Sequence, residues 1–352
     1  MVLMESCREE VAVLKPLVPP AFWEEQRKCV GRAFSCSLGA TERKLVCVTS
    51  GNSYLGSHLV RELLAHGYLV RVTLQNPVDF EDMKELVSNE EMNQLESVVI
   101  AKVGNLDSLC DAFRGCHAIF HTSSFIDPHG VSGYSERMAF LEAEGARNVI
   151  EACGRAAYVK RCIFTSSLLA SVWQGSATEG IVDESCWSDE EFCRGNKFWL
   201  ALGKITAEKV AWRKAKEMKV KLITVCHGLL MAPSFPHPHN ETSLPYLKGG
   251  RNMLQQGTLA TEDVGNIAEA HVYAYKAMDY GACGRYLCFG RVIRRLGEAI
   301  RLENGLKMPG LLSGGRNDVL SEETDEEIQS RLSNSRLARL VALVSQRVSC
   351  KQ

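Results

Sequence analysis

Residues 44–67 read KLVCVTSGNSYLGSHLVRELLAHG, and the fold class follows from this stretch. It opens with a short apolar run rich in β-branched residues, which predicts a buried strand at 44–49. A turn of small residues comes next. Apolar residues at helical spacing then continue to Gly67, the kind of residue at which helices end. Strand, tight turn and helix in this order are typical of an α/β protein with a parallel sheet.

The same alternation continues through most of the chain. Further short apolar runs predict buried strands at 68–74, 97–103, 117–121, 161–166 and 221–226. Longer periodic stretches predict helices at 57–67, 136–156 and 203–218. Strands that alternate with helices in this way predict a doubly wound parallel sheet, the Rossmann architecture, with helices on both faces.

After residue 230 the alternation loosens, which predicts a smaller lobe beside the sheet. A helix at 263–278 and a late strand at 285–290 are the clearest elements there. We expect a partly disordered N-terminal extension, a dinucleotide-binding Rossmann domain, a substrate lobe with elements that return to the sheet, and a C-terminal loop and helix. In that order they span residues 1–42, 43–230, 231–311 and 312–352.

The overall composition is that of an ordinary globular protein. The 352 residues carry a formal net charge of −1, so neither nucleic acid nor an acidic membrane surface is expected as a partner. No uninterrupted apolar run approaches the ~18 residues of a membrane helix. The 14 cysteines form no CxxC pair, which favours reduced thiols and the cytoplasm, with a Cys186–Cys193 redox pair as the minor alternative. No metal site is expected, and the oligomeric state stays open.

The turn after the first strand is a candidate binding site. In a Rossmann fold this turn has the spacing T-G-x-x-G-x-x-G, whose glycines allow a tight turn and a close approach to a pyrophosphate. Here Gly56 keeps its place, Ser50 and Ser53 occupy the other two, and Gly51 is a candidate to absorb the turn. An α/β turn without a cofactor is the alternative. The residues predicted to line the cofactor are Thr49, Ser50, Gly51, Ser53, Tyr54, Leu55 and Gly56.

The residues at the end of the second strand bear on the choice of cofactor. An acid at this place binds the ribose of NAD, and a basic group favours the 2′-phosphate of NADP. The stretch at 71–76 reads RVTLQN, in which neutral Gln75 stands near the tip. The residues themselves therefore leave NAD and NADP open.

A more specific signal begins at VDESCWSDEEFC (182–193), followed by GK (203–204) and AEKVAW (207–212). FRGCHAIFHTSS (113–124) and KRCIFTSS (160–167) add to it. With these motifs the chain resembles the cinnamoyl-CoA reductase and dihydroflavonol reductase group of plant extended short-chain dehydrogenases/reductases, over about residues 43–300. The resemblance implies NADP as cofactor and reversible hydride transfer to the carbonyl of a phenylpropanoid-type small molecule.

The resemblance also implies a catalytic serine, tyrosine and lysine. The serine corresponds to Ser167 and the lysine to Lys204, but the tyrosine corresponds to Leu200. The lysine of this set holds the nicotinamide ribose and lowers the pKa of the tyrosine, which donates the proton. The further cofactor-lining positions that the resemblance implies are Gln75, Lys102, Thr122 and Ser123.

Leucine cannot donate a proton, and loss of a positioned acid costs about 10²–10⁴-fold in rate. Tyr134, in the loop after the fourth strand beside His129, and His227, after the sixth strand, are candidates to replace the donor. The alternative for His227 is a hydrogen-bonded loop histidine. The stretch before Lys204 reads NKFWLALGK, whereas the CoA-specific reductases of the group carry NWYCYGK. Two hypotheses follow: a reductase with weak or altered activity, and an inactive nucleotide-binding pseudoenzyme with an interaction or sensing role.

Overall fold

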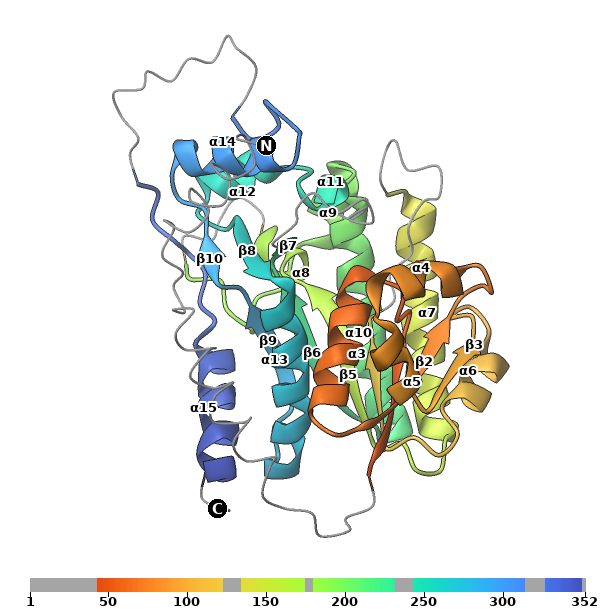
Figure 1. Ribbon diagram of the computed structural model, residues 1–352. Helices are drawn as coiled ribbons and strands as arrows, with labels where there is room; N and C mark the ends of the chain where they lie inside the picture. The colour runs from red at the N-terminus through yellow and green to blue at the C-terminus, as the bar shows by residue number, and fades with distance from the viewer. Residues whose placement is uncertain (1–42, 123–133, 175–179, 232–242, 314–326, 350–352) are drawn as a thin grey trace, which may run out of the picture.

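The computed structural model describes residues 43–122, 134–174, 180–231, 243–313 and 327–349. Its centre is a seven-stranded, entirely parallel sheet (Figure 1). The strand order β3-β2-β1-β4-β5-β6-β9 reverses direction beside β1, which is the doubly wound arrangement. The strands are β1 (Leu45–Thr49), β2 (Leu69–Leu74), β3 (Ser97–Ile100), β4 (Ala118–His121), β5 (Arg161–Ser167), β6 (Lys221–His227) and β9 (Gly284–Cys288).

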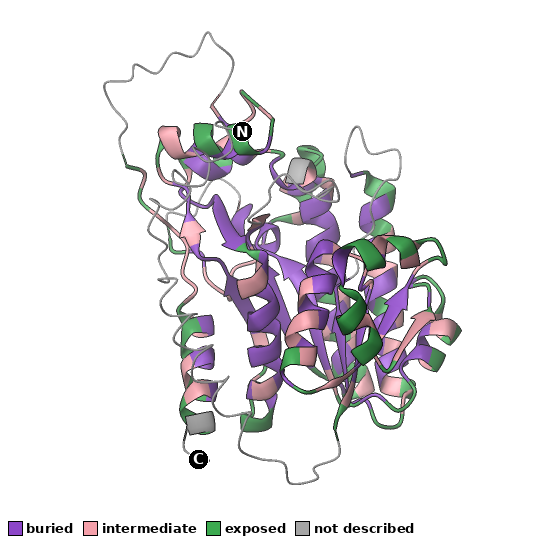
Figure 2. Cartoon of the chain, viewed as in Figure 1, coloured by how far each residue is buried: buried purple, intermediate pink, exposed green. Residues whose placement is uncertain are grey.

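Helices cover both faces of this sheet. On one face α3 (Tyr54–Ala65) packs against α13 (Val264–Ala277), and α13 packs against α15 (Ser335–Ser349). On the other face lie α6 (Leu106–Ala112), α7 (Glu136–Arg155) and α10 (Trp199–Met218). The inner strands between them are largely buried, whereas the edge strand β3 is only partly buried (Figure 2). The predicted doubly wound parallel sheet is confirmed.

The remaining elements are shorter. Two helices, α4 (Asp79–Leu86) and α5 (Asn89–Gln94), connect β2 to β3. Figure 1 shows the others gathered mainly at the end of the sheet where the strands finish. They are α8 (Leu169–Val172), α9 (Glu190–Gly195), β7 (Leu229–Met231), α11 (Ser243–Tyr246), α12 (Gly250–Gln255), β8 (Ala260–Asp263), η1 (Met278–Tyr280), β10 (Arg291–Val292) and α14 (Leu296–Gly305).

A lobe with its own core lies at the carboxyl end of the strands. Strands β10, β8 and β7 form a second sheet there, and α12 and α14 lie above it in Figure 1. Its core includes Trp173, Phe198 and Leu200, so residues that follow β5 contribute to it as well. Two predicted elements of the late chain, α13 and β9, belong instead to the main sheet and its cover.

Several boundaries differ from those predicted. The helix expected from residue 203 begins at Trp199, so Leu200 and Lys204 both lie on α10, one turn apart. The C-terminal helix is present, and its apolar side chains, such as Leu340 and Val341, are buried in the core shared with α13. No helix in the described part of the chain is long and apolar enough to cross a membrane.

One buried arginine holds the middle of the string at 182–193. Arg285 on β9 donates to the backbone oxygens of Glu184 and Cys186, and its guanidinium stacks 3.7 Å from the centre of the Trp187 ring. The same guanidinium forms an ion pair with Glu208 of α10, with 2.9 Å between Nε and Oε1. Through Arg285, the loop formed by the string is thus attached to β9 of the sheet and to α10.

Some expectations fall outside the described residues. These are the N-terminal extension at 1–42, the cofactor-lining Ser123, His129 in the loop near the expected cleft, and most of the loop expected at 312–328.

Candidate active site

The turn after β1 has the tight shape of a nucleotide-binding turn. Ser50 has a φ of 52°, a left-handed conformation that costs a non-glycine residue about 1–2 kcal/mol. The expectation that Gly51 would absorb the turn is wrong, because Gly51 does not have a positive φ. Its lack of a side chain serves packing, since a Cβ there would lie 2.3 Å from Cγ1 of Val72.

The first turn of α3 is closed by a serine cap. The Oγ of Ser53 accepts the backbone N–H of Gly56 at 3.0 Å. A Cβ on Gly56 would lie 2.3 Å from the backbone oxygen of Ser50, so only glycine allows helix and turn to approach this closely. Tyr54 and Leu55 begin the helix and are buried. This segment has the form of a pyrophosphate cradle at a helix N-terminus.

The backbone N–H groups at the end of β2 bind a carboxylate of the same chain. The carboxylate of Asp79 accepts the backbone N–H groups of Gln75 at 3.0 Å and of Asn76 at 2.9 Å. The side-chain oxygen of Gln75 accepts the N–H of Val103 at 3.2 Å, which links the ends of β2 and β3. Lys102 lies beside this link and is exposed. The ends of β2 and β3 thus carry an exposed cation.

The end of β4 is tied to the end of β1. Thr49 Oγ1 lies 2.9 Å from Nδ1 of His121 and accepts the N–H of Thr122 at 3.1 Å. The pKa of His121 is lowered to about 4, mainly by burial, while the Glu142 charge opposes this shift and the Lys204 cation adds to it. His121 is therefore a neutral imidazole at pH 7, and it places a polar ring between the turn and α10.

Ser167 ends β5, directly beside the end of β6. It is buried, its Oγ accepts the N–H of Leu169 at 3.2 Å, and in the strand register it pairs with His227. His227 Nδ1 lies 2.6 Å from the backbone oxygen of Gly228, so this nitrogen carries the proton. Burial lowers the pKa of His227 to about 4, with Lys204 and His271 contributing. At neutral pH its Nε2 is an acceptor, which does not suit a proton donor.

The first turns of α10 carry the largest departure from the expected site. Leu200 is buried in the apolar core of the lobe. Lys204, 8% exposed, forms an ion pair with Glu142 of α7, which is 5% exposed. The predicted helix lysine is thus a buried cation neutralised by a carboxylate of the same chain. The burial of Lys204 excludes the alternative that it is a solvated lysine on the surface of the helix.

Tyr134 joins the same cluster. Its hydroxyl donates to the second carboxylate oxygen of Glu142 at 2.9 Å, and Gly203 makes room for it, because a Cβ there would lie 2.9 Å from that hydroxyl. Burial raises the pKa of Tyr134 well above 10, and the Glu142 charge raises it further. Such a phenol is a poor acid. Tyr134 therefore completes a buried Tyr134–Glu142–Lys204 network instead of replacing the missing donor.

The structure brings together several residues named from the sequence. Thr49, Thr122, Ser167, Lys204 and His227 gather where the strands end. Two residues with evident roles were missed. Glu142 falls in an amphipathic helix, where a charged residue is usually expected to face solvent. His121 is the last residue of an apolar strand, and its position at the carboxyl end was the available signal.

The sheet order, the turn after β1 and the position of the cluster define a Rossmann-type dinucleotide-binding protein of the short-chain dehydrogenase/reductase class. Residues 47–287 match the 3-beta hydroxysteroid dehydrogenase/isomerase family, and this chain belongs to that family. A cinnamoyl-CoA reductase of Petunia hybrida is 36% identical over 265 residues, which cover 74% of this chain and 76% of that protein. The resemblance to the cinnamoyl-CoA reductase and dihydroflavonol reductase group is confirmed.

Solved structures agree on the fold. Vestitone reductase from alfalfa, 25% identical, superposes with a TM-score of 0.61 over 85% of this chain and 92% of its own. A yeast methylglyoxal/isovaleraldehyde reductase in complex with NADPH has a TM-score of 0.60 over 87% of this chain and 97% of its own. The latter is 17% identical, so it supports the fold alone.

Proposed function

We propose that this chain binds NADP(H) and exchanges hydride, slowly, with the carbonyl or alcohol group of a phenylpropanoid-type small molecule. Support for the reaction class comes from the family and from the cinnamoyl-CoA reductase relatives. We expect the reaction to be slow because Leu200 is buried one helical turn before Lys204. At this position the resemblance to the family implies the tyrosine that donates the proton.

The residues of this chain suit the pyrophosphate of a dinucleotide better than its adenosine end. The turn from Ser50 to Gly56 offers a helix N-terminus and close backbone approach for a pyrophosphate. Lys102 offers a cation near the adenosine end, which favours NADP, although Asp79 already occupies the two N–H groups at the tip of β2. When bound, the cofactor would supply the hydride. We propose that the lobe at 231–311 contacts the substrate.

The chain contributes little proton chemistry of its own. Ser167 is positioned to donate a hydrogen bond to a substrate oxygen at the end of β5. Neither Leu200 nor the neutral His227 supplies the proton that a developing alkoxide needs. Without a positioned acid, we expect a rate about 10²–10⁴-fold below that of a complete site.

A second candidate function is nucleotide binding without turnover. It is favoured by the ion pair between Lys204 and Glu142, because a lysine held by a buried carboxylate is less free to bind a nicotinamide ribose. In that case the protein would act through a nucleotide-dependent contact with another molecule. The cytoplasm remains the location that we propose for either function, and a small molecule the partner.

The test combines NADPH titration, followed by nicotinamide fluorescence, with turnover of cinnamoyl-CoA, cinnamaldehyde and dihydroflavonols. We expect binding with slow turnover in the natural protein, and a rise of about 10²-fold or more in Leu200→Tyr. Leu200→Phe is the matched control, since it adds the ring without the hydroxyl and should leave the rate unchanged.

The outcomes separate the candidates. Binding without measurable turnover in the natural protein, together with a gain in Leu200→Tyr, would establish the second candidate and not the first. Failure to bind NADPH or NADH would refute both. Equal rates in Leu200→Tyr and Leu200→Phe would show that the missing hydroxyl is not what limits the reaction.

A further inference from the structure

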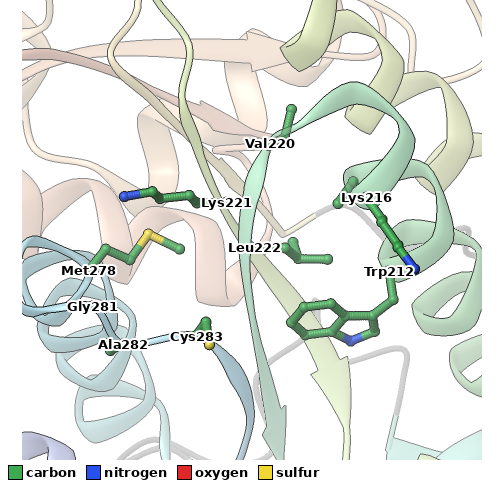
Figure 3. A pocket seen from close by; sticks show the side chains of 10 residues that line it. Trp212, Lys216, Val220, Lys221, Leu222, Met278, Gly281, Ala282 and Cys283 are labelled. Carbon is green, nitrogen blue, oxygen red and sulfur yellow. The ribbon is translucent and has the colours of Figure 1, made fainter.

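A cavity of about 300 Å³ opens at the far end of the sheet from the cluster around Lys204. Its walls come from α10, the first residues of β6 and the segment 278–283 (Figure 3). Lys221 is the first residue of β6, so the cavity lies at the amino end of the parallel strands. Ser167 and His227, in contrast, are the last residues of β5 and β6. The cavity is therefore separate from the proposed nucleotide site.

Most of the lining of this cavity is apolar and one wall is flat. The half-buried indole of Trp212 lies beside Leu222, and Figure 3 shows its six-membered ring turned toward that side chain. Met278 approaches from the opposite wall. A planar ring inserted here would gain contact with the indole and remove apolar surface from water. The volume stands at the lower end of the range for small-ligand pockets, which limits the occupant to one or two rings.

Two cations flank the cavity without counter-ions. Lys216 and Lys221 are exposed, and neither side chain has an ion pair with any residue in the described ranges. Figure 3 shows their side chains extending to different sides of the cavity. Acidic neighbours along the chain are already engaged: Asp279 lies 2.6 Å from Arg161, and Glu217 lies 3.4 Å from Lys214. An anion at the mouth would meet positive potential that the protein leaves uncompensated.

We propose that this cavity is a second ligand site, which takes a small planar aromatic carboxylate. The ring lies against Trp212 and Leu222, and the carboxylate turns outward to Lys216 or Lys221. The apolar lining selects the ring and the unpaired lysines select the negative charge. The proposal does not depend on the function proposed above, because it uses none of the residues of the nucleotide site.

The experiment uses the full chain and 2-naphthoate as the probe, with affinity measured by calorimetry. Occupancy is located through Cys283, an exposed thiol that lines the cavity. We expect saturating 2-naphthoate to slow alkylation of Cys283 by iodoacetamide at least fivefold, as followed by mass spectrometry. Lys216→Glu and Lys221→Glu should each raise Kd about tenfold. The matched control is Lys44→Glu, which reverses an exposed lysine outside the cavity.

Three results would overturn the proposal. One is an unchanged alkylation rate at Cys283 with bound probe, which would place the probe elsewhere. A second is equal affinity for neutral 2-naphthamide, which would remove the role of charge. The third is a Lys44→Glu effect as large as that of the cavity lysines. Trp212→Phe provides a further variant that keeps an aromatic core and should weaken binding. Circular dichroism checks that each variant is folded.

Discussion

The turn after β1 and the first turns of α10 lie at the same end of the sheet, and both lack residues expected of the family. In the turn, Ser50 adopts the left-handed backbone and Ser53 caps α3, so the shape is kept with different residues. On α10, Leu200 stands where the resemblance implies a tyrosine hydroxyl, and the ammonium group of Lys204 is neutralised by Glu142 of α7. A site built from backbone tolerates substitution better than one built from side-chain chemistry. The predictions below test this contrast.

The largest effect on stability is expected from Glu142→Ala. The substitution leaves Lys204 buried without its carboxylate and removes the acceptor of the Tyr134 hydroxyl. Breaking a buried pair in this way costs about 3–5 kcal/mol of unfolding free energy. The matched control is Asp111→Ala, which breaks the exposed pair with Arg114 and should cost about 0–1 kcal/mol. Urea denaturation measures both, and similar losses would contradict a structural role for the buried network.

The next effect concerns pH and the neutral His121. Its folded pKa is about 4, against 6.5 for an ordinary histidine. Between these values the unfolded state binds more protons, so the free energy of unfolding falls as the pH drops from 6.5 toward 4. Each such histidine contributes a slope of roughly 1 kcal/mol per pH unit. His121→Gln should flatten the slope relative to the natural protein when urea denaturation is followed across this pH range, and an unchanged slope would contradict the neutral state of His121.

A smaller loss of stability is expected from Gly56→Ala. The new methyl group would lie 2.3 Å from the backbone oxygen of Ser50, so the turn has to shift. Overpacking of this kind costs about 1–3 kcal/mol, and NADPH affinity should fall with it. Gly104→Ala is the control, since a Cβ there meets nothing within 4 Å. Equal melting temperatures for the two variants would show that the turn is looser than the structure describes.

The smallest effect has the opposite sign. Ser50→Gly removes the strain of a left-handed serine, so we expect a gain of up to about 1 kcal/mol in unfolding free energy. Gly51→Ala in the same turn should lose stability, because its Cβ meets Val72. If Ser50→Gly destabilises the protein, its hydroxyl holds the turn more strongly than the backbone conformation strains it.

Much of the fold was predictable because apolar residues recur at regular spacings in the buried strands and helices. The alternation from 44 to 227 predicted the doubly wound parallel sheet that the structure has, and the resemblance to the reductase group assigned Leu200 to the position of the tyrosine. Glu142 was not predictable, since a helix period does not tell which acid faces a buried lysine on another helix. The backbone of Ser50 was not predictable either, because Gly51 offered the more usual way to turn.

The contacts of Arg285 explain why the string at 182–193 reports the family of the chain and not its reaction. This guanidinium binds two backbone oxygens of the string at 182–193, stacks on its tryptophan, and pairs with Glu208 of α10. None of these contacts involves Leu200 or Lys204. The residues that identify the family most specifically thus have a structural role, and they give no information about catalytic activity. Proteins classified by this string alone share an architecture, and a prediction of their activity has to rest on the residues of helix α10.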